Sequence, residues 1–170
     1  MNAVDLWSYL TPDMREGLEK KFSDRDETEL HGQIEECLKF LYIASLTGRT
    51  FIPLCSELDD IWHELIVETR FYQDFCSKLP GGKFLHHAAI DMETYAEKIG
   101  KEQAVGDSLD WLPRYYHHFG AFIEERARWW SIVEFLRNEM GLTLPEINEV
   151  ARSAAAEMAG PGIPASTSAS

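Results

Sequence analysis

Regularly spaced apolar residues and recognisable helix caps run along almost the whole 170-residue chain, and they constrain its fold more than any other feature. Between residues 26 and 48 the apolar residues recur at steps of three and four, which is typical of one face of an α-helix. Thr11 followed by Pro12 marks a helix start, and Gly48 marks a helix end. No stretch alternates apolar and polar residues as a half-buried strand would. The sequence therefore predicts an all-α fold.

The same signals divide the chain into about six or seven helices. After two helices over residues 12–22 and 26–47, Pro53 separates a third helix, which we expect over residues 57–78. The Pro80-Gly81-Gly82 turn ends that helix. Later helices are expected over residues 88–99, 109–119, 122–140 and 144–158. Pro113 fits this pattern only in a first helical turn, because an interior proline removes a backbone hydrogen bond.

Length and composition predict one compact domain. With 170 residues and 45% hydrophobic content, the chain can build a single packed core, which we place in a bundle over residues 1–158. Residues 159–170 are small, polar and contain proline, so we expect a flexible tail there. The first residues lack a signal-peptide pattern, and no stretch reaches the roughly 18 apolar residues of a membrane span. Three cysteines without a CxxC pair are typical of a reduced, cytoplasmic protein.

The charge of the chain excludes some partner classes. Asp and Glu outnumber Lys and Arg by 29 to 16, which gives a formal net charge of −13. A field of this sign repels phosphate backbones and anionic membrane surfaces. We therefore expect neither nucleic acid nor a membrane as a partner. The remaining classes are a protein partner and a small-molecule substrate.

The third expected helix turns His63 away from its buried face. At about 100° per residue, the buried face lies opposite His63. Its residues are Leu58, Ile61, Leu65, Thr69, Tyr72 and Cys76. Asp59 precedes His63 by four residues, so both side chains reach one point from a single turn. Imidazole and carboxylate groups are common ligands of zinc, iron and manganese. The alternative is a solvated polar stripe, in which Asp59 completes a capping box with Ser56.

A pair of adjacent histidines, His86-His87, follows the glycine turn. The turn reverses the chain and can bring His86 or His87 back towards the preceding helix. Neighbouring residues of a non-helical segment point to opposite sides, so one histidine would face the site and the other would not. The sequence leaves open which of the two does so, and whether both are incidental loop residues. Arg70 shares the helix face of His63 and is a candidate to hold an anionic substrate.

The Trp62-His63 pair and the His86-His87 pair belong to a longer pattern of spaced residues. The pattern reads WH-x2-I-x2-T-x2-Y-x2-FC…G-x-F-x-HH, and its residues are Trp62-His63, Ile66, Thr69, Tyr72, Phe75-Cys76, Gly82, Phe84 and His86-His87. Asp59 precedes it at a matching distance. This pattern resembles the helical domain of the glycine-rich domain-containing proteins and their uncharacterised bacterial relatives. The chain departs from it at Leu65, where many members have a second histidine, and at Ala88, where many have proline. It also lacks the glycine-rich segment. The resemblance implies a helical domain and a site location, and no particular reaction.

Two functions remain open. In the first, Asp59, His63 and one or both of His86 and His87 bind a divalent zinc, iron or manganese ion. Its open coordination positions would admit water or oxygen for metal-dependent chemistry on a small molecule. In the second, the histidines organise helix–loop packing in a non-catalytic module that binds a protein partner. A cysteine nucleophile is disfavoured because Cys76 points away from His63.

Overall fold

The computed structural model describes residues 5–48, 54–87, 91–158 and 160. Within them it contains one 3-10 helix, nine α-helices and no strand. The helices are η1 (Leu6–Tyr9), α1 (Pro12–Lys21), α2 (Glu27–Thr47), α3 (Ser56–Val67), α4 (Thr69–Lys78), α5 (Met92–Ile99), α6 (Lys101–Phe119), α7 (Glu124–Ala127), α8 (Ser131–Met140) and α9 (Leu144–Met158). The all-α prediction is confirmed, but the expected number of helices was too low. Except for Gly160, the predicted tail over 159–170 lies outside the described residues.

Side-chain caps begin the first two α-helices. The Thr11 hydroxyl accepts a hydrogen bond from the Met14 amide at 3.2 Å, and the Asp26 carboxylate accepts one from the Glu29 amide at 3.0 Å. Gly48 ends α2 with a φ of 66°, a left-handed conformation that suits glycine. The boundaries expected for α1 and α2 are therefore confirmed to within a residue or two.

Removing one of these caps is expected to have a moderate effect. Asp26→Ala should lower the free energy of unfolding by about 1 kcal/mol, because the Glu29 amide loses its acceptor at the start of the longest helix. Urea denaturation followed by circular dichroism measures this. An unchanged midpoint would mean that water replaces the cap at no cost.

Two breaks explain the wrong helix count. The helix expected over 57–78 is interrupted at Glu68, whose φ of −80° and ψ of 61° leave the helical region. The break rotates the buried face of α4, so that Phe75 enters the core and Thr69, expected inside, is exposed. The helix expected over 122–140 is likewise divided into α7 and α8.

Helix α6 is longer than expected, which leaves the count unchanged. It begins at Lys101 and carries Pro113 in its interior, where a first-turn position was expected. A proline there removes one backbone hydrogen bond. Trp111, Leu112 and Tyr115 are all buried around it, and their burial offsets that loss.

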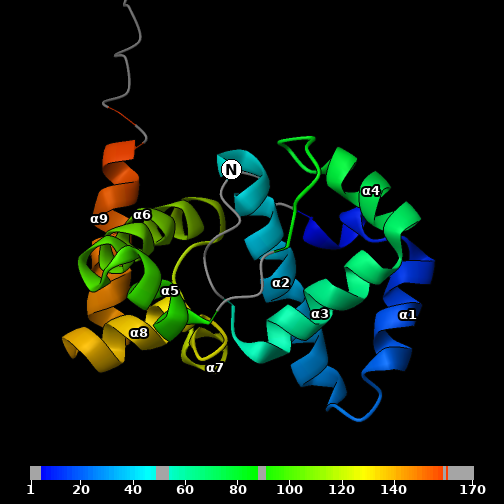
Figure 1. Cartoon of the computed structure of the whole chain (residues 1–170), viewed down its shortest axis with the longest axis horizontal. Helices are drawn as coiled ribbons and strands as arrows, with labels where there is room; N and C mark the ends of the chain where they lie inside the picture. The colour runs from blue at the N-terminus through cyan, green and yellow to red at the C-terminus, as the bar shows by residue number, and fades with distance from the viewer. Residues whose placement is uncertain (1–4, 49–53, 88–90, 159, 161–170) are drawn as a thin grey trace, which may run out of the picture.

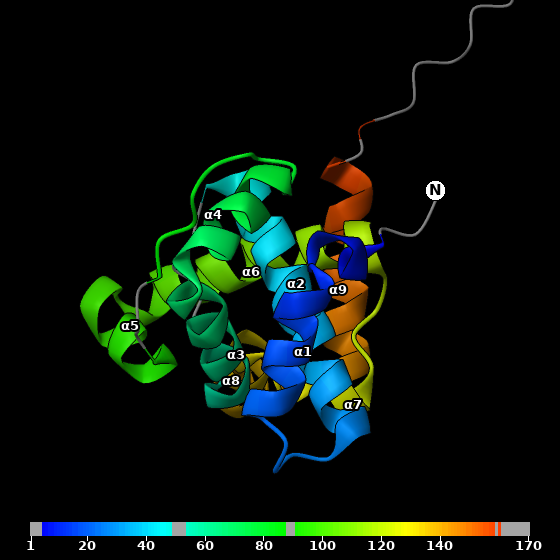
Figure 2. The same cartoon turned by 90° about the vertical axis from the view of Figure 1, so that its right-hand side faces the viewer.

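Helix α2 lies at the centre of the fold. In Figure 1, α1, α3 and α4 lie on one side of α2, and α5 to α9 lie on the other; Figure 2 views the molecule from the side of α1 and α3. The Phe40 ring of α2 joins the two sides. Its centroid lies 5.3 Å from those of Trp62 and Trp111 and 6.5 Å from that of Trp130. One aromatic core therefore supports the whole bundle.

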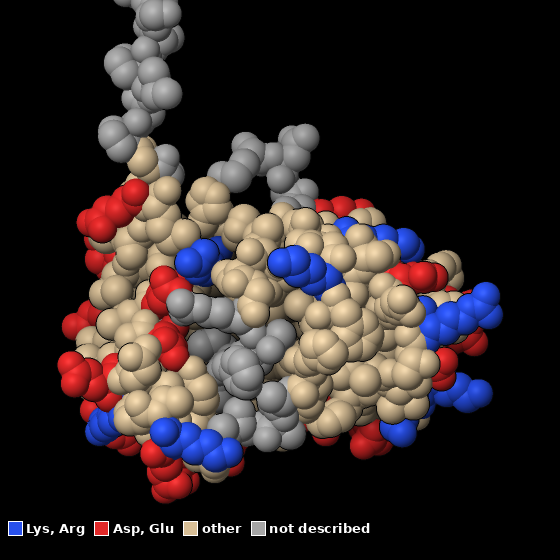
Figure 3. Space-filling model, turned by 45° about the horizontal axis from the view of Figure 1, so that its top comes forward, with Lys and Arg blue, Asp and Glu red and all other residues tan. Residues whose placement is uncertain are grey.

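Charged side chains are interspersed on the surface. On the face drawn in Figure 3, Lys and Arg lie singly among Asp and Glu and form no continuous basic area. Among the described helices, none combines the length and the apolar character needed to cross a membrane.

Candidate functional site

Three of the predicted ligands lie together beside α3. Asp59 and His63 come from successive turns of that helix, and His87 comes from the segment after α4. The His87 Nε2 atom lies 2.6 Å from Asp59 Oδ1, and the His63 Nδ1 atom lies 3.3 Å from Asp59 Oδ2. The two imidazole centroids are 4.1 Å apart. One potential ligand atom from each residue lies within 4.8 Å of the other two.

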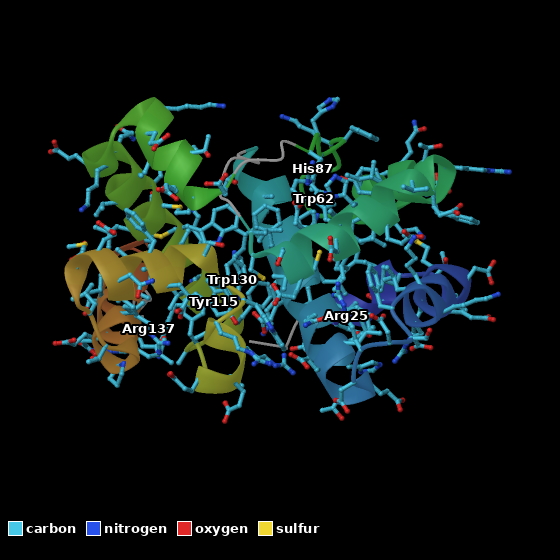
Figure 4. The ribbon with its side chains drawn as sticks, turned by 60° about the horizontal axis from the view of Figure 1, so that its bottom comes forward. Arg25, Trp62, His87, Tyr115, Trp130 and Arg137 are labelled. Carbon is cyan, nitrogen blue, oxygen red and sulfur yellow. The ribbon has the colours of Figure 1, made fainter. Side chains whose placement is uncertain are left out.

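This cluster is open on one side. The His87 side chain is 11% exposed and meets the edge of Trp62, with 4.5 Å between the ring centroids. Figure 4 labels this pair. The Asp59 and His63 side chains are 32% and 53% exposed. An ion or small molecule could therefore approach from the His63 side, while Trp62 packs against His87 on the buried side of the cluster.

A buried tyrosine connects the two segments of the cluster. The Trp62 indole N–H donates to the Tyr72 hydroxyl at 2.9 Å, and that hydroxyl donates to the Leu85 carbonyl at 2.6 Å. Leu85 is buried, and residues two apart in an extended segment share a side, so His87 also faces α3. His86 points away: it is exposed, and its ring lies 5.0 Å from that of Phe84. The structure thus brings His87 to the cluster and leaves His86 outside.

Gly81 explains why a glycine turn lies between His63 and the His86-His87 pair. Its amide lies 3.4 Å from the Ser45 hydroxyl, near the end of α2. A Cβ atom on Gly81 would lie 1.8 Å from the Ser45 carbonyl oxygen, a backbone atom that no side-chain movement can relieve. Only glycine therefore allows the turn to pack against α2 and return the chain towards α3.

The other candidates are not among the three residues of the cluster. Arg70 is exposed on α4, beyond the break at Glu68. Cys76 is buried, as its place on the apolar face predicted. Burial raises the pKa of Cys37, and it raises the pKa of Cys55 to about 12. Neither of these thiols is ionised at neutral pH, so neither is an activated nucleophile.

A family model described as UCP032817-like matches residues 4–106, which is more than half of the chain. The chain belongs to the UCP032817-like family. This family is uncharacterised, and the match does not test the resemblance to the glycine-rich domain-containing proteins, which stays a prediction. No curated protein and no solved structure matches the chain. The Asp59–His63–His87 cluster lies wholly inside the UCP032817-like segment.

A buried carboxylate that the sequence did not predict connects this UCP032817-like segment to the later helices. The Glu36 side chain of α2 is fully buried. Its Oε1 accepts hydrogen bonds from Lys39 at 2.7 Å and Arg126 at 3.2 Å, and its Oε2 accepts from Tyr115 and Trp130, both at 2.9 Å. Burial, followed by the nearby Glu36 charge, raises the pKa of Tyr115, so the phenol stays a donor. Both oxygens of the Glu36 carboxylate are thus bonded to four donors, one on α2 and three between residues 115 and 130. With its oxygens bonded in this way, the carboxylate has a structural role.

Proposed function

We propose that this protein binds a divalent transition-metal ion through Asp59, His63 and His87. The observation that carries the proposal is the convergence of three potential ligand atoms within 4.8 Å, from two segments separated by a helix and a turn. Two imidazoles and one carboxylate form a ligand set that zinc and non-haem iron use. Manganese also accepts nitrogen and carboxylate ligands.

The geometry fits such an ion after small movements. Tetrahedral zinc, with bonds of about 2.0–2.1 Å, separates its ligand atoms by about 3.3 Å. The separation of His63 Nδ1 and Asp59 Oδ2 is already 3.3 Å. His87 Nε2 contacts the other oxygen, Asp59 Oδ1, at 2.6 Å, so an ion bound through Oδ2 requires this hydrogen bond to open. The His63 ring is more than half exposed, so it can rotate to complete the set.

An ion held by three protein ligands would keep open coordination positions. In such a site the ion supplies an acidified water molecule or a binding position for oxygen. Metal-dependent hydrolysis or oxygenation of a small molecule is therefore the reaction class that we propose. The exposed side of His63 gives a substrate access, and Arg70 stays the predicted contact for an anionic group.

Metal content tests the proposal directly. We expect the native protein to bind one equivalent of Zn²⁺, Mn²⁺ or anaerobic Fe²⁺, measured by elemental analysis and titration calorimetry. His63→Ala, His87→Ala and Asp59→Ala should each weaken binding at least about 100-fold, because loss of a mere outer-shell partner costs 10–100-fold. His86→Ala is the matched control, since its ring lies outside the cluster, and it should bind like the native protein.

Two results would contradict the metal site. One is native protein that takes up none of the three ions even after incubation with each. The other is equal loss in His86→Ala and His87→Ala, which would indicate a general effect of the loop. Circular dichroism of every variant separates lost binding from lost folding.

The second candidate function is a non-catalytic interaction module. The 2.6 Å hydrogen bond between His87 and Asp59 favours it, because that bond joins the loop to α3 without an ion. In this case the cluster stabilises the fold and the acidic surface meets a protein partner. Its signature is a native protein without metal affinity whose stability falls when His87 is replaced.

A further inference from the structure

We infer that the Tyr72 hydroxyl is the positioning group for the His87 ligand, an inference that rests on the proposed metal site. Tyr72 contacts none of the three ligands through a hydrogen bond. Its hydrogen bonds go instead to the indole N–H of Trp62, the residue before His63, and to the backbone carbonyl of Leu85, two residues before His87. One hydroxyl therefore sets the position of the second ligand segment relative to the first.

The hydroxyl is fully used in this role. A phenolic group has one proton to donate and lone pairs to accept. Here the proton goes to the Leu85 carbonyl at 2.6 Å, and a lone pair takes the Trp62 indole proton at 2.9 Å. Burial raises the pKa of Tyr72, so the proton that binds Leu85 stays in place at neutral pH. Both Trp62 and Leu85 are themselves buried, and water is no ready substitute.

Neighbouring aromatic rings restrict the position of the Tyr72 side chain. Tyr72 stacks on Phe75 at 6.1 Å, and Phe84 meets its ring edge-on at 5.2 Å. Trp62 in turn meets the His87 imidazole. The segment that carries His87 is thus fixed through the hydroxyl and through Trp62.

Removal of the Tyr72 hydroxyl is expected to loosen the segment that carries His87. In Tyr72→Phe the Trp62 N–H and the Leu85 carbonyl lose their partners while the ring still packs. A buried donor or acceptor without a partner is destabilising, so both groups are expected to shift towards other partners. A looser segment would hold His87 beside the other two ligands for a smaller fraction of the time, and apparent affinity falls with the fraction of the protein that is competent to bind.

The test compares two tyrosine-to-phenylalanine variants of the full chain. Tyr72→Phe should weaken Zn²⁺ binding about 10–100-fold in titration calorimetry, the effect expected for loss of a group that orients a ligand. Tyr115→Phe removes an equally buried hydroxyl, which donates to Glu36, far from the ligands. It should lower the melting temperature and leave Zn²⁺ affinity unchanged. Equal affinity of Tyr72→Phe and the native protein would overturn the inference while the metal site stood.

A second measurement needs no metal. The His63 and His87 rings, with centroids 4.1 Å apart, should give strong nuclear Overhauser cross-peaks in the metal-free protein. Tyr72→Phe should weaken these cross-peaks several-fold, and Tyr115→Phe should retain them. If the native protein bound no metal but the cross-peaks weakened as expected, the proposed function would fail and the positioning role would stand. Cross-peaks of native strength in Tyr72→Phe would overturn the positioning role.

Discussion

Glu36→Gln is expected to lower the free energy of unfolding by about 3–5 kcal/mol, the range for breaking a buried ion pair on one side. In the native protein the carboxylate accepts four hydrogen bonds, two of them from the cations Lys39 and Arg126. An amide of the same shape offers only one oxygen, and its NH₂ group faces donors. The change therefore leaves buried donors unpaired and removes the charge that compensates two cations. Urea denaturation followed by tryptophan fluorescence measures the loss.

Glu29→Gln is the matched control for this experiment. Glu29 also pairs with an arginine, Arg128, but both side chains are largely exposed. Exposed ion pairs contribute about 0–1 kcal/mol, so this variant should unfold close to the native midpoint. A loss below about 1 kcal/mol in Glu36→Gln would show that Glu35, which also contacts Lys39 and Arg126, is sufficient to hold the cations.

Gly81→Ala is expected to cost about 3 kcal/mol or more, at the upper end for an overpacked site. The added Cβ would meet the Ser45 carbonyl oxygen at 1.8 Å, so either the end of α2 or the turn must move. Movement of the turn also displaces the segment that carries His87. We therefore expect weaker metal binding together with the lower stability, measured on the same protein by calorimetry and urea denaturation.

The adjacent glycine provides the comparison. Gly82 has a φ of 58°, and the nearest atom to an added Cβ is the Ser77 carbonyl oxygen at 3.9 Å. Gly82→Ala should therefore cost only the strain of a left-handed alanine, about 1–2 kcal/mol. Equal losses in the two variants would mean that backbone conformation, and not contact with α2, makes the turn require glycine.

Local signals in the sequence predicted much of the fold. Thr143 begins α9 as expected, through a reciprocal capping box in which its amide bonds the Glu146 carboxylate at 2.8 Å. The four-residue spacing of Asp59 and His63 placed both on one side of α3. Alternation after the turn predicted that only one of the two later histidines would face the helix. Each of these signals depends only on residues close together in the chain, so it can be read from the sequence.

The remainder depends on contacts between distant residues. Nothing near Glu68 is a proline or a glycine, and the break there is visible only in the structure, where Phe75 is buried and Thr69 is exposed. Glu36 is one of four acidic residues of α2, and its partners are up to 94 positions away. The neighbouring Glu35 is also acidic, so the sequence gives no sign that Glu36 is the buried one and names none of its partners.

The Glu36 carboxylate has a consequence for how sequences of the UCP032817-like family can differ at position 36. The UCP032817-like match ends at residue 106, within α6, yet Tyr115, Arg126 and Trp130 bond Glu36 from beyond it. The same helices cover the carboxylate, so without them position 36 would lie open to solvent, where a glutamate needs no buried partners. Position 36 and the donors of the later helices are therefore expected to be inherited together. A relative that kept these helices but lacked the donors would need an apolar residue in place of the glutamate.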